Sequence, residues 1–148
     1  MAVDLDAAVR FSAGRIVNGG RVQDKIYFGP GITWGAVSQT EMHRLATDVR
    51  HELAYRVHYM ALARANAIGH AEFGAGELRE LLRNKAGEPT RDTTVSAAVR
   101  KARDLGLIQR ESTVRCLVLS QHQFRRNDRA SRSCRTHGIR PRRGTSMP

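Results

Sequence analysis

Residues 94–108 read TVSAAVRKARDLGLI, and this stretch decides the fold. Its apolar residues recur at steps of three, one, three and three, which is the spacing of one face of a helix: Val95, Ala98, Val99, Ala102 and Leu105. Gly106 ends the pattern, because glycine is the usual residue just beyond a helix. The sequence therefore predicts a helix from Thr93 to Leu105 with one buried face and one polar face.

The residues on either side extend this helix into a larger unit. Glu77–Leu82 predicts a short helix, and the polar residues 84–89 predict a loop that Gly87 and Pro89 keep from being helical. Asp92 or Thr93 can cap the following helix. After Gly106, two strands are expected at residues 107–110 and 114–119, joined by residues 111–113.

This order of helix, loop, helix and hairpin resembles the winged helix-turn-helix DNA-binding proteins. Thr94–Ile108 is similar to their second helix and first wing strand, and Ala61–Phe73 is similar to the leading helix of replication-initiator-like and phage winged-helix proteins. The unit as a whole resembles small helix-turn-helix proteins of actinobacterial phages, over roughly residues 55–119. The resemblance implies double-stranded DNA as the partner.

The resemblance also implies which residues contact DNA. Base-facing candidates come from the helix and its start: Asp92, Thr93, Ser96, Ala97 and Arg100. Thr94 is a further DNA-binding candidate on the same helix. Residues expected near phosphates are Arg91, Lys101, Arg110 and Arg115. Asp92 is unusual at its position, and it either caps the helix or accepts a hydrogen bond from a cytosine amine. The loop between the two helices is longer than a tight turn.

The preceding part of the chain predicts a long helix. Ser38 and Glu41 have the spacing of a capping box, and the helical pattern runs from there to about Ala67, with room for one break. One face carries apolar residues at steps of three and four: Leu45, Val49, Leu53, Val57, Met60 and Ala61. This face packs on the domain behind it or on a second copy, so a homodimer through the helix 40–67 is one expectation.

Residues 1–37 predict a small β-rich extension. Asn18-Gly19-Gly20 lies between two short β-prone segments, and Asn-Gly favours the tight turn of a hairpin. Lys25–Phe28 suggests a further strand, which Gly29-Pro30-Gly31 stops. Trp34 is expected to pack as a lid on the core.

The positive charge of the chain is concentrated towards its end. The net charge is +11, and residues 91–143 hold 14 of the 25 Lys and Arg but 4 of the 14 Asp and Glu. A polyanion is the partner that such a charge favours. From Gln121 the chain has almost no apolar residues, so a disordered Arg-rich tail is expected over 121–148. Four of its arginines are candidates for phosphate contacts: Arg125, Arg126, Arg129 and Arg132.

Sulfur and imidazole ligands suggest zinc at one set of residues, Cys116, His122, Cys134 and His137. Their spacings are irregular, apart from the pair Cys134 and His137. We therefore predict no metal site and no cofactor, and the zinc question stays open at these residues. No arrangement typical of catalysis stands out, since His51-Glu52 lacks the second histidine of a helical zinc protease.

Together these features predict an α+β, mainly helical protein with a winged helix-turn-helix domain over 38–120. We expect sequence-specific double-stranded DNA binding by a bacteriophage-type transcriptional regulator in the cytoplasm of a bacterial host, and neither an enzyme nor a membrane protein. Two alternatives remain: a replication-initiation factor at an origin, or a host-interaction protein that uses a winged-helix fold without binding DNA.

Overall fold

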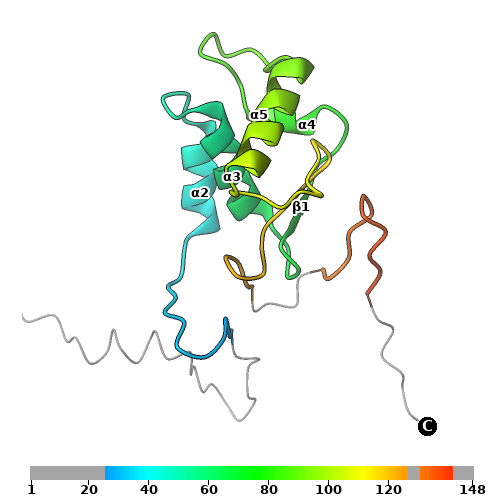
Figure 1. Ribbon diagram of the computed structural model, residues 1–148. Helices are drawn as coiled ribbons and strands as arrows, with labels where there is room; N and C mark the ends of the chain where they lie inside the picture. The colour runs from blue at the N-terminus through cyan, green and yellow to red at the C-terminus, as the bar shows by residue number, and fades with distance from the viewer. Residues whose placement is uncertain (1–25, 127–130, 142–148) are drawn as a thin grey trace, which may run out of the picture.

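Four helices and one two-stranded antiparallel sheet form the regular structure of the residues that the computed structural model describes, 26–126 and 131–141. In chain order the elements are α2 (Gln39–Thr47), α3 (Leu53–Arg64), β1 (His70–Glu72), α4 (Glu77–Leu81), α5 (Asp92–Asp104) and β2 (Cys116–Val118) (Figure 1). The predicted α+β, mainly helical class is confirmed. No helix of the described residues is long and apolar enough to cross a membrane.

The long helix expected before residue 67 is two helices. Ser38 caps α2 by accepting a hydrogen bond from the backbone N–H of Glu41 at 3.2 Å, as predicted. The Glu41 carboxylate pairs with Arg44. Between the helices, the Asp48 carboxylate binds the backbone N–H and the guanidinium of Arg50, which stabilises the turn where the helix breaks.

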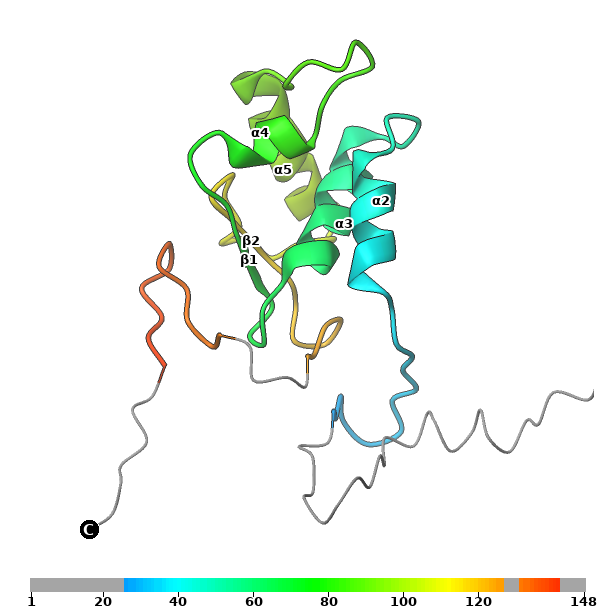
Figure 2. The ribbon, with the colours of Figure 1, turned by 180° about the vertical axis from the view of Figure 1, so that it is seen from behind.

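The core lies around α3, which packs against α2, α5 and β1 (Figures 1 and 2). Val57, Met60 and Ala61 of the predicted stripe are fully buried, and Leu53 packs against them. The α3 part of the expected apolar face is therefore packed within the chain, while Leu45 and Val49 are half-buried. A homodimer through residues 40–67 stays a prediction.

One arginine on α3 belongs to this core. Arg56 is 4% exposed, and its guanidinium donates to the carbonyl oxygens of Ala46 at 2.8 Å and Arg83 at 2.9 Å. Burial lowers the pKa of Arg56. Its hydrogen bonds link the end of α2 to the loop after α4.

The sheet differs from the predicted hairpin. β2 pairs with β1, with His70 opposite Val118 and Glu72 opposite Cys116. Residues 107–110 are not a strand, although the N–H of Gln109 donates to the carbonyl of Val118 at 2.8 Å. The expected continuation of the leading helix through residues 65–73 is also wrong, because α3 ends at Arg64 and a turn at Gly69, with φ +80°, leads into β1.

The described part of the N-terminal extension, residues 26–37, has a turn at Gly29–Ile32 but no strand. The strand predicted at 25–28 is therefore not formed over its described part, residues 26–28. The predicted hairpin at 15–23 lies outside the described residues. Trp34 is half-buried and lies 6.2 Å from Phe28, ring centre to ring centre.

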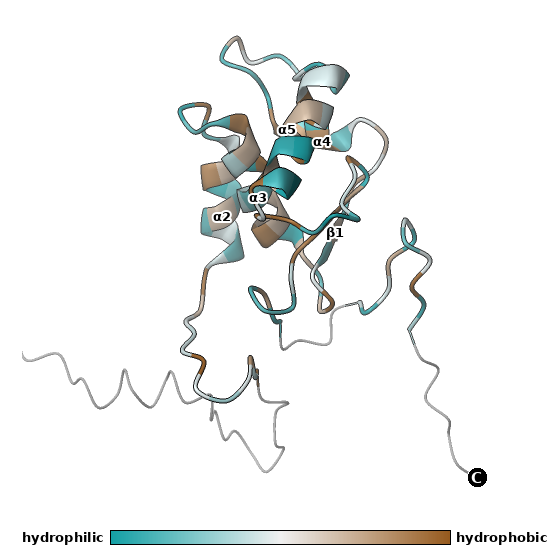
Figure 3. Ribbon diagram, viewed as in Figure 1, coloured by the Kyte–Doolittle hydropathy of each residue, from teal (hydrophilic) through white to brown (hydrophobic). Residues whose placement is uncertain are grey.

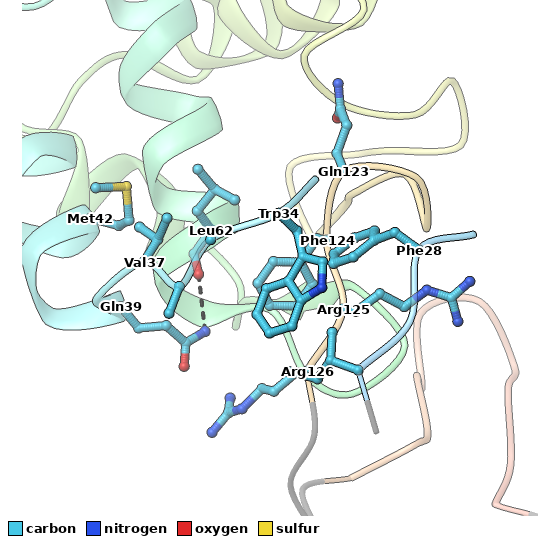
Figure 4. Close-up of a pocket in the computed structure, with 13 residues that line it drawn as sticks. Phe28, Trp34, Val37, Gln39, Met42, Leu62, Gln123, Phe124, Arg125 and Arg126 are labelled. Carbon is cyan, nitrogen blue, oxygen red and sulfur yellow. Dashed lines mark hydrogen bonds between the residues drawn. The ribbon is translucent and has the colours of Figure 1, made fainter. Parts of the chain in front are cut away.

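These two rings line a hollow of about 250 Å³ between the extension, the start of α2 and residues 123–126 (Figure 4). Further large apolar side chains line it as well: Ile26, Val37, Met42, Leu62 and Phe124. The side-chain amide of Gln39 closes one edge by donating to the carbonyl of Leu62 at 3.0 Å. Trp34 thus packs over a hollow at the edge of the core, which refines its predicted role as a lid.

Residues 131–141, which lie within the tail that composition predicts to be disordered, dock beside the sheet (Figure 2). Cys134 is fully buried, and its backbone pairs with Ile139 through hydrogen bonds of 2.9 and 2.8 Å. The side chain of Asn66 donates to the carbonyl of Ser133 at 2.9 Å. The low apolar content of the tail did not predict this docking, because polar groups and the Cys134 sulfur provide most of the contacts.

Candidate nucleic-acid interface and a cysteine–histidine cluster

The orientation of α5 follows from its sequence. Its buried face consists of Val95, Ala98, Val99 and Ala102, and it packs on α3 and α4. The helix begins and ends within one residue of the predicted bounds. Because these four residues fix one face to the core, the opposite face is presented to solvent. Figure 3 shows strongly hydrophilic residues in the turns of α5 nearest its C-terminal end.

All ten residues predicted to contact DNA are exposed: Arg91, Asp92, Thr93, Thr94, Ser96, Ala97, Arg100, Lys101, Arg110 and Arg115. Seven of them lie within α5 and Arg91 directly precedes it, so the helix brings them together. Arg110 and Arg115 flank the turn that leads into β2. The placement of these side chains is compatible with a contiguous polar surface.

Two charged residues of this surface already have partners. The Lys101 ammonium pairs with the Glu52 carboxylate, which raises the pKa of Lys101. Asp92 pairs with Arg79 of α4, with 3.3 Å between Oδ2 and Nη1. Among the described residues no carboxylate forms an ion pair with Arg91, Arg100 or Arg110 in the structure.

Asp92 does not cap α5, which corrects the first of the two roles predicted for this residue. Arg91 is the N-cap, without a side-chain hydrogen bond, and Asp92 is the first residue of the helix. A carboxylate in the first turn interacts favourably with the helix dipole. Its pairing with Arg79 also joins α5 to α4, so Asp92 has a structural role without capping.

The other basic candidates are held to different degrees. The Arg115 guanidinium donates to the carbonyl of Phe73 at 3.1 Å, which ties it to the residue after β1. In the tail, Arg125 donates to Gln121, Arg126 donates to Ala65, and Arg132 is exposed. Arg129 lies outside the described residues.

A separate cluster forms where the docked tail meets the sheet. Four potential metal-ligand side chains converge, with their donor atoms all within 4.8 Å of one another: His70, Cys116, Cys134 and His137. The Cys116 and Cys134 sulfurs lie 3.6 Å apart, and both cysteines are free. Nδ1 of His70 lies 3.6 Å from the Cys116 sulfur, and Nδ1 of His137 lies 3.3 Å from the Cys134 sulfur.

This cluster differs by one residue from the set that the sequence suggested. His122 is exposed and outside the cluster, and His70 of β1 takes its place. No spacing in the sequence relates His70 to the cysteines, since it reaches them through the β1–β2 pairing. β1 itself was not predicted, and its three residues carry no alternation in the sequence that could have placed His70 beside the cysteines.

One carbonyl group and one carboxylate group orient the cluster from outside. Nε2 of His137 donates to the carbonyl of Glu111 at 2.9 Å, which turns Nδ1 towards Cys134. The Glu72 carboxylate accepts hydrogen bonds from the backbone N–H groups of Arg135 and Thr136, at 2.7 and 3.0 Å. Burial opposes ionisation of Glu72, but the hydrogen bonds outweigh it and lower the pKa.

Burial shifts the pKa values of two of these side chains, Cys116 and His70. It raises the pKa of the Cys116 thiol well above its usual range, and the hydrogen bond with Cys134 acts in the same direction. Burial lowers the pKa of His70, as does the neighbouring His137. The imidazole of His70 is therefore kept in its neutral form, which is the form that ligates metals.

Comparison with protein-family models, with curated proteins and with solved structures found no match for this chain. Functional inference therefore depends on the residues and their arrangement.

Proposed function

We propose that this protein binds double-stranded DNA in a sequence-specific manner, with α5 in the major groove. The observation that carries the proposal is the exposed face of α5, which combines small polar residues with basic ones while its other face is buried in the core. A rigidly held helix with such a face is the usual means of reading base edges.

The order of elements supports a winged helix-turn-helix as the finer fold. α3 leads into β1, α4 and α5 follow, and the chain returns through a turn to β2, which pairs with β1. In this proposal α5 is the recognition helix. The turn at residues 110–115 is the wing, which is short and therefore suited to phosphate contacts more than to insertion into the minor groove.

Individual residues then have distinct roles. Thr93, Ser96 and Ala97 are small, so the start of α5 can approach the groove floor closely. Arg100 extends from the same exposed face, and its guanidinium suits the two acceptors of guanine. Lys101 is paired with Glu52, so it must release the Glu52 carboxylate in order to contact a DNA phosphate.

The proposed biological role is that of a phage-type transcriptional regulator. A replication-initiation factor would use the same helix, and iterated sites near an origin would favour it over a single site at a promoter. If the protein is instead a host-interaction protein that does not bind DNA, no salt-sensitive affinity for DNA is expected. Selection of bound sequences from random duplex DNA distinguishes these cases: an enriched motif supports specific binding, and its distribution in the encoding genome separates the two DNA-binding roles.

Substitution of Arg100 tests the assignment of α5. We expect Arg100→Ala to weaken binding to the selected duplex by about 1–3 kcal/mol, or about five- to 150-fold, with a much smaller effect on random duplex. Titration of labelled duplexes by fluorescence anisotropy measures both.

The matched control is Arg44→Ala. It removes the same charge from α2, where Arg44 is exposed and paired with Glu41. An unchanged affinity in Arg100→Ala, or an equal loss in Arg44→Ala, would contradict recognition through α5.

A further inference from the structure

Three segments that are distant in the sequence bring sulfur and imidazole groups together at one point. His70 comes from β1, Cys116 from β2, and Cys134 and His137 from the turn in the docked tail. We propose that these four side chains bind one zinc ion, which fastens residues 131–141 to the β1–β2 sheet. This inference does not depend on DNA binding.

Three of the six distances between the donor atoms are close to those of a tetrahedral zinc site. With Zn–S near 2.3 Å and Zn–N near 2.0–2.1 Å, tetrahedral geometry separates two sulfurs by about 3.8 Å and a sulfur from a nitrogen by about 3.6 Å. The structure has 3.6 Å between the Cys116 and Cys134 sulfurs. It has 3.6 and 3.3 Å for the two sulfur–nitrogen pairs. The remaining pairs lie within 4.8 Å. Side-chain adjustments of about 1 Å therefore bring the four atoms around one ion.

The groups around the site prepare it for a cation. A ligating histidine usually donates its other ring N–H to a carbonyl or carboxylate, which fixes its orientation. His137 does this with the carbonyl of Glu111. The backbone N–H of His137 also lies 3.4 Å from the Cys134 sulfur, and such a donor stabilises a thiolate.

The turn that carries two of the ligands is held in place. Gly138 has φ +67°, a conformation that side chains disfavour, and it lets the chain close so that Cys134 pairs with Ile139. Glu72 binds the backbone of residues 135 and 136. Cys134 and His137 are thus presented together towards the sheet.

The chemistry of the donors favours zinc over other ions and over a disulfide. Two thiolates and two imidazoles in a closed tetrahedron are typical of structural zinc, whereas magnesium and calcium prefer oxygen. A disulfide needs its sulfurs about 2.05 Å apart, well below the 3.6 Å between Cys116 and Cys134. Four protein ligands leave no open position, so the ion is structural and not catalytic.

Cobalt substitution of the full chain tests the site. Protein kept reduced and stripped with a chelator is titrated with Co²⁺ and followed by visible absorption. We expect uptake of one equivalent, with thiolate-to-cobalt charge transfer and the intense d–d bands of tetrahedral cobalt, and displacement by Zn²⁺. No uptake, the weak spectrum of a six-coordinate ion, or a Cys116–Cys134 disulfide in the reduced preparation would overturn the proposal.

Ligand variants identify the residues that hold the ion. Cys134→Ser and His137→Ala lie outside the helical core, so far-UV circular dichroism should show the helices retained. Cobalt affinity in each should fall by more than the roughly 10- to 100-fold that outer-shell changes cause. His122→Ala is the matched control, since His122 is exposed and outside the cluster. Unaltered binding in His137→Ala, or an equal loss in His122→Ala, would overturn the assignment.

Discussion

The α5 surface and the cysteine–histidine cluster are assembled in opposite ways. The first is formed by thirteen consecutive residues, whose helical period separates a buried face from an exposed one. The second needs residues from His70 to His137, and it exists only after β1, β2 and the tail have come together. Local periodicity can therefore provide a recognition surface, whereas a metal site of this kind depends on the complete tertiary structure.

The two regions should also differ in what stabilises them. The helices share one aliphatic core, while the tail is attached by hydrogen bonds and, in our proposal, by zinc. If this distinction is correct, substitutions in the core destabilise the helices and the attached tail together, whereas substitutions in the tail leave the helices folded. The following predictions test it from the largest expected effect to the smallest.

Met60 lies at the centre of the helical core. It is fully buried on α3, so Met60→Ala leaves a cavity and should lower the free energy of unfolding by about 2–5 kcal/mol. Urea unfolding followed by circular dichroism measures the loss. Met42→Ala is the matched control, because Met42 is half-buried beside the hollow near Trp34. This substitution should lower the free energy of unfolding much less. Equal losses of unfolding free energy in the two variants would contradict the assignment of Met60 to the main core.

Glu72 tests the attachment of the tail. Glu72→Gln removes the charge that accepts hydrogen bonds from residues 135 and 136, and charge-assisted bonds of this kind contribute about 1.5–3 kcal/mol each. We expect cobalt affinity to fall by roughly 10- to 100-fold, as for other outer-shell changes. Faster hydrogen exchange at the amides of Arg135 and Thr136 is the second measurement.

The helices should be unaffected by this change. Their amides in α3 and α5 should exchange at the same rate in Glu72→Gln as in the unaltered protein. Faster exchange throughout α3 would contradict the comparison, because it would make the tail and the helical core one cooperative unit.

Much of the helical part could be predicted because its signals are local. The stripe from Val95 to Ala102 gave the bounds of α5 to within one residue, and the Ser38 cap located the start of α2. The exposure of the seven proposed DNA contacts within α5 followed from the same period. Their chemical role stays a prediction.

The remaining features depend on distant contacts. Arg56 reads as a surface residue, but it is buried because carbonyls before and after it in the chain accept its hydrogen bonds. β1 is only three residues long, too short for a clear alternation, so His70 had no visible connection to Cys116. The tail has few apolar residues, and its contacts with Asn66 and Glu72 cannot be read from composition.

The smallest predicted effect concerns the arginines of the docked tail. Arg132 and Arg140 are exposed, and neither is a proposed zinc ligand. If they contact phosphates, Arg132→Gln with Arg140→Gln should reduce the slope of log affinity against log salt concentration by up to about 1.8, since each contact contributes about 0.9. The loss should be equal for selected and random duplex, because phosphates carry no sequence information.

Substitution is a sharper test of the tail than truncation, since removing residues after Ser120 would also remove Cys134 and His137. Arg44→Gln with Arg50→Gln is the control for net charge, because both arginines pair with carboxylates around α2. An altered preference for the selected duplex in the tail variant would mean that the tail takes part in sequence choice. In that event the zinc ion would position a second recognition element, and the separation between the α5 surface and the cluster would hold for folding but not for function.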